Sequence, residues 1–273
     1  MRPDRHGAIG VFDSGVGGLT VLKTLIERLP LESTVYLGDT ARVPYGTKSG
    51  EVVTRYSLAN AKLLLEHGIK VLVVACNTAS AVALPALRAS LPIPVVGVIS
   101  PGATAAAQAT KSGTIAVIGT QGTIASGAYQ AALKLARPDA TVLTRACPLF
   151  VPLAEEGWLS GEVPRLVARE YLTHGLLDDG VDTLVLGCTH YPLLASIIAE
   201  VAGPNVQLVD SASATAEQVA EVLREHGLLK GHHSPVEHRY LVTDTPARFI
   251  EVGERFLGRP LSGAQQVDLQ KYL

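Results

Sequence analysis

Two cysteines stand at matching positions in two similar segments of the chain. Residues 68–78 and residues 180–190 are near-copies, and Cys76 and Cys188 occupy the equivalent position in each. A thiolate can take a proton and a thiol can give one. Two thiols presented by a duplicated scaffold suit a reaction that removes a proton from one face of a carbon atom and delivers a proton to the other face.

The residues after each cysteine bear on the reactivity of the thiol. Asn77 and Thr78 follow Cys76, and Thr189 and His190 follow Cys188. Side chains of these types can cap a helix, and the N–H groups of a helix start lower the pKa of a thiol from about 8.5 towards neutrality. Both thiols are therefore expected to ionise readily.

Each half also offers one titrating neighbour for its thiol. His190 could polarise Cys188, and Asp13, which ends an early apolar run, could assist Cys76. A lone Cys is otherwise a common buried core residue. Cys147 has no counterpart in the other half, so we expect it to be structural.

Two loops add further candidates for substrate binding. The segment 13–18, Asp-Ser-Gly-Val-Gly-Gly, is not a dinucleotide fingerprint, because the third glycine of that motif would fall on Thr20. Its backbone donors and Ser14 suit a carboxylate, and Asp13 could orient an ammonium group. Tyr45 and Gly46 could bring a phenol and a backbone N–H to the ligand.

Apolar runs of strand length alternate with helical patterns along the whole chain. The expected strands are 8–12, 34–38, 71–75, 94–98, 114–118, 141–145, 183–187, 206–209 and 239–242. Helical patterns include 18–29, 50–66, 123–136, 162–175, 213–226 and 246–257. This alternation predicts an α/β fold with parallel sheets flanked by helices. The carboxyl ends of such strands line the ligand crevice, and both cysteines follow strand ends.

The duplication predicts two similar domains related by a pseudo-twofold axis, with the active site in the cleft between them. Residues 9–14 resemble residues 115–120, so each half opens with a strand that ends in a hydroxyl residue, Ser14 or Thr120. We place the first domain at 1–98 plus 208–273 and the second at 99–207.

Composition excludes several classes of protein. The 273 residues carry a net charge of −2 without a long basic run, which argues against nucleic-acid binding. No apolar run reaches the roughly 18 residues of a membrane span. Three cysteines are an odd number for a disulfide framework, and together these features indicate a cytoplasmic protein with reduced thiols.

Taken together, the motifs resemble those of the glutamate racemase family, within the aspartate/glutamate racemase superfamily. The matching segments are Asp13-Ser14-Gly15-Val16-Gly17-Gly18, Gly38-Asp39, Pro44-Tyr45-Gly46, Cys76-Asn77-Thr78-Ala79, Cys147-Pro148-Leu149-Phe150-Val151-Pro152-Leu153 with Glu155, and Gly187-Cys188-Thr189-His190-Tyr191-Pro192. The set occurs in this order and spans almost the whole chain.

The resemblance implies interconversion of L- and D-glutamate by two thiols, without cofactor or metal. Cys76 would take the proton from the D isomer and Cys188 from the L isomer. Glu155 would assist on the His190 side. Substrate would be held by Asp13, Ser14, Tyr45, Gly46, Asn77, Thr78, Thr189 and His190. Members of the family supply D-glutamate for peptidoglycan and usually form dimers, so a homodimer is expected.

Other functions stay open on the residues alone. Aspartate racemases share the two cysteines and differ in the pocket for the side chain, whereas decarboxylases of the superfamily need only one thiol. A binding protein whose two lobes close on an amino acid would explain the duplication but not the paired thiols. A metal protein could use Cys76, Cys188 and His190 as ligands.

Overall fold

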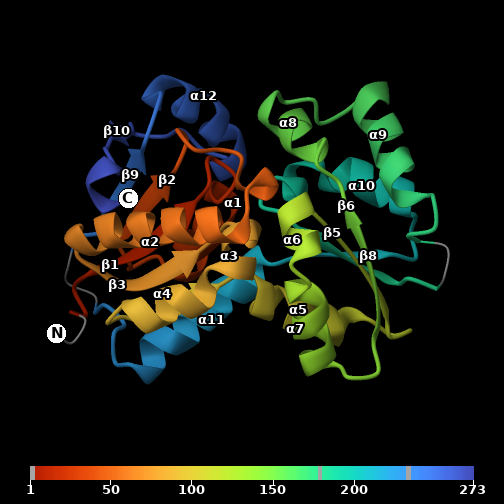
Figure 1. Ribbon diagram of the computed structural model, residues 1–273, viewed down its shortest axis with the longest axis horizontal. Coiled ribbons are helices and arrows are strands. Elements are labelled where there is room, and N and C mark those ends of the chain that lie inside the picture. Colours follow the sequence, from red (N-terminus) through yellow and green to blue (C-terminus); the bar gives the residue numbers. More distant parts are fainter. Residues whose placement is uncertain (1–3, 178–179, 232–234) are drawn as a thin grey trace.

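Two parallel β-sheets lie side by side in the computed structural model, which describes residues 4–177, 180–231 and 235–273 (Figure 1). The first sheet has the order β10-β9-β2-β1-β3-β4, and all its neighbouring strands run parallel. Its strands are β1 (Ala8–Asp13), β2 (Thr34–Gly38), β3 (Ile69–Val74), β4 (Val95–Gly97), β9 (His238–Val242) and β10 (Gln265–Gln266).

The second sheet repeats four adjacent strands of the first, β2-β1-β3-β4. Its order is β6-β5-β7-β8, again all parallel, from β5 (Thr114–Gly119), β6 (Thr141–Ala146), β7 (Thr183–Gly187) and β8 (Gln207–Asp210). In both sheets the strand that leads to a cysteine, β3 or β7, pairs with the strand that opens its half, β1 or β5. The expected fold class, α/β with two similar halves, is confirmed, whereas the division of the chain at residues 98 and 207 stays a prediction.

Helices cover the faces of both sheets (Figure 1). They are α1 (Leu19–Arg28), α2 (Gly50–Glu66), α3 (Asn77–Val82), α4 (Leu84–Ser90), α5 (Ile99–Ala109), α6 (Gln121–Ala125), α7 (Ala128–Ala136), α8 (Phe150–Glu155), α9 (Glu162–Leu172), α10 (Ala195–Ala202), α11 (Ala212–Glu225) and α12 (Pro246–Leu257). Short 3₁₀ turns occur at Tyr45–Thr47, Tyr191–Leu194 and Gln270–Tyr272. None of the helices described is both long and apolar enough to cross a membrane.

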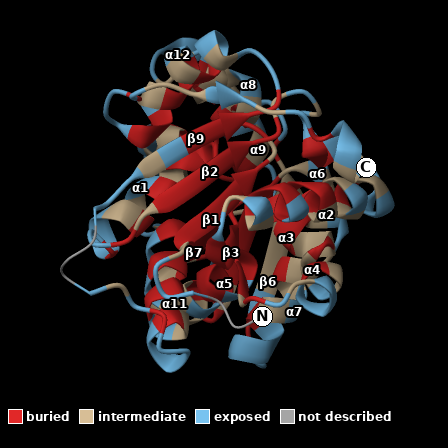
Figure 2. Cartoon of the chain, turned by 90° about the vertical axis from the view of Figure 1, so that its left-hand side faces the viewer, coloured by how far each residue is buried: buried red, intermediate tan, exposed pale blue. Residues whose placement is uncertain are grey.

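The central strands are buried on both faces, which explains their continuous apolar runs. Because successive side chains of a strand point to opposite faces, Val71 and Val73 join one apolar cluster while Leu72 and Val74 join another. Figure 2 shows the buried strands between helices whose outer faces are exposed. The first cluster continues into Ala116 of the second sheet, so the two halves share a core.

Two differences from the expected elements have local causes. The pattern over 123–136 forms two helices rather than one, because Gly127 adopts a left-handed conformation with φ of 69° between α6 and α7. Helices α3, α5 and α8 are absent from the helices expected from sequence. They are short or rich in alanine, glycine and proline, so their apolar periodicity is weak.

Candidate active site

A cavity of about 210 Å³ lies where the carboxyl ends of the two sheets meet. Nine of the ten predicted site residues line it. The lining residues are Ser14, Val43, Pro44, Tyr45, Gly46, Thr47, Cys76, Asn77, Thr78, Thr120, Gln121, Pro148, Val151, Pro152, Cys188, Thr189 and His190. The tenth, Asp13, is fully buried and does not line the cavity as the structure describes it.

Cys76 stands directly before α3, at the end of β3, so its thiol points from a rigid strand-to-helix junction. The thiol donates a long hydrogen bond of 3.8 Å to Ser14 Oγ, which follows the neighbouring strand β1. Asp13 lies beneath, where its carboxylate accepts hydrogen bonds from the Gly15 N–H at 2.9 Å and from Thr189 Oγ1 at 3.4 Å. The carboxylate therefore ties the Cys76 side of the cavity to the Cys188 side.

Cys188 belongs to a chain of three side chains. Its sulfur lies 3.8 Å from His190 Nδ1, and His190 Nε2 lies 2.8 Å from Glu155 Oε1. The imidazole is buried, with Phe256 of α12 packed edge-on against it at a centroid distance of 5.1 Å. Glu155 therefore orients His190, and His190 in turn faces the thiol, as in other sites where an imidazole lies beside a reactive cysteine.

Asn77 offers a donor to the cavity. Its Oδ1 accepts a hydrogen bond of 2.7 Å from the phenol of Tyr129 on α7. Its Nδ2 is buried and makes no hydrogen bond within the described part of the chain. Since a buried amide is normally paired, this nitrogen leaves one donor unused beside the cavity.

Glycines let the two halves approach closely around the cavity. A Cβ at Gly17 would lie 2.3 Å from Thr189 Oγ1 and 2.5 Å from His190 Nδ1. A Cβ at Gly46 would lie 2.7 Å from Thr120 Cβ. In both places a loop of the first half packs on the second half without room for a side chain. This close packing, rather than turn geometry, explains why the residue is glycine.

Hydroxyl groups join the halves on the opposite wall. Thr78 Oγ1 lies 2.9 Å from Thr120 Oγ1 and 3.1 Å from Thr123 Oγ1. Thr120 directly follows β5 as Ser14 directly follows β1, so the duplicated strands place a hydroxyl at equivalent positions of the cavity. No three His, Cys, Asp or Glu side chains among the described residues are grouped to hold a metal ion.

One expectation about the site is wrong in part. The ring of Tyr45 lines the cavity, but its phenol donates to Asp39 Oδ2 at 2.5 Å and accepts from Asn60 Nδ2 at 3.0 Å. This network holds the phenol in the core, where its hydroxyl is engaged by Asp39 and Asn60.

Sequence and structure comparisons place this architecture among known proteins. The sequence profile of the Asp/Glu/Hydantoin racemase family matches residues 9–219. The chain belongs to this family. It is 62% identical to the glutamate racemase of Geobacter metallireducens over 263 residues, 96% of this chain and 97% of that protein.

Solved structures agree with this assignment. A glutamate racemase of Francisella tularensis in complex with D-glutamate superimposes with a TM-score of 0.91 at 39% identity, over 98% of this chain and all of that one. The RacE1 glutamate racemase of Bacillus anthracis superimposes with a TM-score of 0.90 at 41% identity, over 97% and 98% of the two chains.

The two thiols of this family member differ in electrostatic environment. Burial, together with the nearby Asp13 carboxylate, raises the pKa of Cys76 to about 12, although an N–H of α3 acts in the opposite direction. The expectation that a helix start brings this thiol towards neutrality is therefore wrong. Desolvation outweighs the few backbone donors of a six-residue helix.

His190 creates the opposite environment for Cys188. Burial lowers the pKa of His190, but the hydrogen bonds to Cys188 and Glu155 outweigh it and raise the pKa to about 10. The imidazole therefore carries a positive charge at neutral pH, and its Nδ1 faces the Cys188 sulfur at 3.8 Å. A cationic imidazole thus lies beside Cys188, whereas a buried carboxylate lies near Cys76.

This asymmetry predicts selective alkylation by iodoacetamide at pH 8. Cys188 is expected to react at least about 100-fold faster than Cys76, because only the thiolate is nucleophilic and a thiol with a pKa of about 12 is ionised in roughly one molecule in 10⁴ at this pH. The two residues are 7% and 6% exposed, so access does not favour either. Peptide mass spectrometry over time gives both rates.

The pH dependence of the same experiment checks the cause. The rate at Cys76 is expected to rise about tenfold per pH unit as pH approaches its pKa. Cys147, whose pKa burial also raises to about 12, provides an internal reference for an inert thiol. Equal rates at Cys76 and Cys188 at pH 8 would contradict the asymmetry.

Some lining residues were not predicted from sequence. Thr120 carried a usable signal, because it is the duplicate of Ser14, and Pro148, Val151 and Pro152 lie in a matching motif. Gln121 and the supporting residue Tyr129 carried none, since an isolated polar residue on a helix does not reveal which distant side chain it meets.

Proposed function

We propose that this family member interconverts L- and D-glutamate with Cys76 and Cys188 as the two acid–base groups, and so supplies D-glutamate for peptidoglycan synthesis. The observation that carries this is the pair of thiols in one cavity, at the carboxyl ends of two equivalent strands. Its relatives from Geobacter, Francisella and Bacillus are glutamate racemases, and the Francisella structure contains D-glutamate.

In the L-to-D direction, the Cys188 thiolate takes the α-proton and becomes a thiol. The electron pair of the broken C–H bond stays on the substrate as a carbanion. The Cys76 thiol then gives its proton to the opposite face and becomes a thiolate. His190 stabilises the thiolate form of Cys188 before the first step, and the protonated resting state of Cys76 suits it to the second.

The carbanion needs stabilisation because an amino-acid α-proton is only weakly acidic. Donors preorganised around a substrate carboxylate in a site that excludes water supply such stabilisation. Asn77 Nδ2 and the hydroxyls of Ser14 and Thr78 lie at the cavity and form this donor set. The Gly46 backbone and the ring of Tyr45 close the wall beside them.

Two further parts of the proposal concern the setting of the enzyme. Cytoplasmic location is supported by three free, buried cysteines, which fit a reducing compartment. A homodimer is supported by exposed apolar side chains, Trp158, Val163 and Leu166, around the start of α9, which a second copy would cover. Sedimentation analysis measures the oligomeric state.

The function is tested by circular dichroism of L-glutamate, D-glutamate and L-aspartate solutions after addition of the purified protein with a chelator and no cofactor. Loss of the signal from both glutamate isomers, with little change for aspartate, is the expected result. Loss with aspartate instead would keep the chemistry and change the substrate. No loss with any of them, from folded protein with reduced thiols, would favour a binding protein.

A further inference from the structure

Helix α12 belongs to the C-terminal part of the chain that extends the first sheet, and it contacts the end of α8. Arg255 Nη1 donates to the backbone carbonyl of Glu155 at 2.7 Å and to that of Ala154 at 3.4 Å. These are the last two residues of α8, where carbonyls lack the usual helical donor four residues further on, although the Ala154 carbonyl also accepts from the Gly157 N–H at 3.2 Å. A cation at this end also interacts favourably with the helix dipole.

The turn after α8 is closed onto the same guanidinium. Gly157 has a φ of 77°, and a Cβ built there would lie 3.0 Å from Arg255 Cζ. A residue with a side chain at this position would push Arg255 away from the carbonyls. The contact is thus a tight fit between two backbone segments and a planar group.

The neighbouring residue on α12 contacts the other member of the same hydrogen bond. Phe256 packs edge-on against the ring of His190, while Arg255 holds the backbone of Glu155. Consecutive residues of one helix turn therefore hold both partners of the Glu155–His190 hydrogen bond. That hydrogen bond is the one that sets the orientation of His190 towards Cys188.

This contact links the two sheets. Helix α12 lies between β9 and β10, which extend the first sheet, whereas α8 follows β6 of the second (Figure 1). Arg255 can reach the Glu155 carbonyl only while the two halves are packed together. The Glu155–His190 pair beside Cys188 is thus supported by the packing of the two halves.

We propose that Arg255 is a positioning residue for the Cys188 side of the reaction, and this rests on the proposed two-thiol function. It fixes the end of α8, so that the Glu155 carboxylate holds His190 against Cys188. Without it, Glu155 becomes mobile, the charged imidazole loses its partner, and Cys188 is a poorer base. Cys76, on the other wall, is unaffected.

The test is Arg255→Ala, assayed in both directions with α-deuterated L- and D-glutamate. kcat/KM is expected to fall about tenfold, less than the roughly 100-fold cost of a full 1 Å misplacement. The fall must be equal in the two directions, because the equilibrium constant of racemisation is one. The deuterium isotope effect on kcat/KM is expected to rise for the L isomer and fall towards one for the D isomer, because proton transfer at Cys188 now limits the rate.

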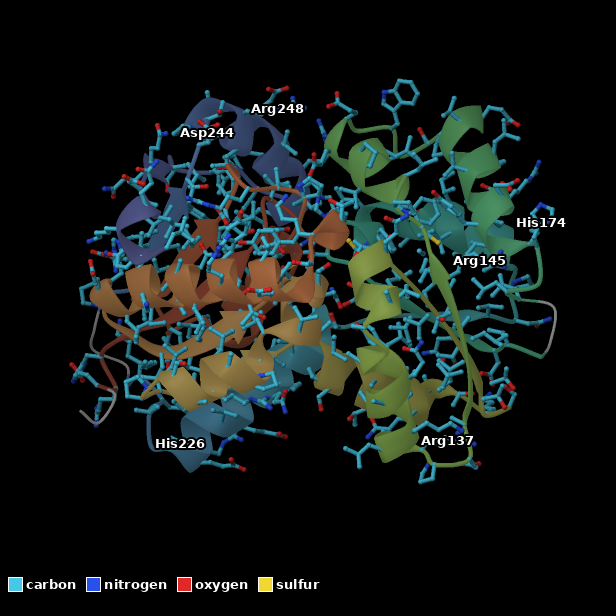
Figure 3. The ribbon with its side chains drawn as sticks, in the orientation of Figure 1. Arg137, Arg145, His174, His226, Asp244 and Arg248 are labelled. Atoms are coloured by element: carbon cyan, nitrogen blue, oxygen red, sulfur yellow. The ribbon has the colours of Figure 1, made fainter. Side chains whose placement is uncertain are left out.

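Arg248→Ala is the matched control. Arg248, labelled in Figure 3, comes from the same helix and forms an exposed ion pair of 2.8 Å with Glu156, the next residue after Glu155. Its loss removes the same charge from the same helix contact without touching the Glu155 carbonyl. Activity within about twofold of the wild type and unchanged isotope effects are expected.

The outcomes separate this inference from the function itself. An inactive wild type would overturn the proposed function, whereas an active wild type with an unaffected Arg255→Ala variant would overturn only the role of Arg255. A loss of activity with an unchanged ratio of the two isotope effects, or an equal loss in Arg248→Ala, would show a general structural role and overturn it too.

Arg255→Lys keeps the experiment decisive if the alanine variant does not fold. Its single ammonium reaches one carbonyl but lacks the planar fork of arginine. A two- to threefold loss is expected, with the isotope effects shifted in the same directions as for alanine. Wild-type isotope effects at reduced activity would contradict the proposal.

Discussion

Cys76→Ser is expected to lower kcat for racemisation by about 10³-fold in both directions, since a positioned acid–base group contributes about 10²–10⁴-fold. A serine hydroxyl is a far weaker acid than a thiol, so it neither delivers a proton to the carbanion efficiently nor returns as a base. Cys188→Ser is expected to cause a loss of the same order. Circular dichroism with each glutamate isomer measures both variants.

A second measurement on Cys76→Ser distinguishes a lost acid from a disturbed cavity. In D₂O, the variant is expected to exchange the α-proton of L-glutamate faster than it racemises it, because Cys188 still removes and returns a proton on its own face. Cys147→Ser is the control, since Cys147 is buried outside the cavity and its thiol donates to the Arg145 carbonyl at 3.7 Å. Near-normal racemisation by Cys76→Ser would show that the two-thiol mechanism is wrong.

Asn77→Asp is expected to lower kcat/KM by about 100-fold. The change replaces a buried donor by a charged acceptor. The free-energy cost of an unpaired or repelling buried group is several-fold larger than the net stabilisation from a neutral hydrogen bond. A substrate carboxylate would then meet a carboxylate instead of the Nδ2 group. Steady-state kinetics with D-glutamate provide the measurement.

Tyr129→Phe tests the same contact from behind. The phenol of Tyr129 fixes which end of the Asn77 amide faces the cavity, so its removal lets the amide turn. An increase in KM of about tenfold is expected, in line with loss of one buried hydrogen bond.

Asn205→Asp is the control for Asn77→Asp. It makes the same chemical change at an exposed position far from the cavity and is expected to leave the kinetics within about twofold. Unchanged kinetics in Asn77→Asp would remove Asn77 from the binding site.

Much of this organisation was predictable because local patterns determine it. A run of residues that is apolar at every position forms a central parallel strand, and parallel strands place their carboxyl ends at one edge. Cys76 and Cys188 follow two such strands, so their meeting in one cavity follows from sequence once the duplication is recognised. Ser14 and Thr120 follow in the same way.

Other parts were decided only by tertiary contacts. Asp39 binds the phenol of Tyr45 in the core. The Asp13 carboxylate lies beneath the cavity and does not line it. Burial raises the pKa of Cys76, against the expectation from its helix start. Arg255 meets the Glu155 carbonyl across a hundred residues of chain.

The physical reason is the range of the interactions. Strand and helix patterns reflect whether a side chain is buried, which each segment records in its own residues. Hydrogen-bond partners, desolvation and the orientation of a polar group depend on atoms contributed by segments far away in the sequence. The sequence by itself therefore determined the two sheets and the placement of two thiols at their facing ends, and the packing of the two halves decided that a charged imidazole faces Cys188 while burial raises the pKa of Cys76.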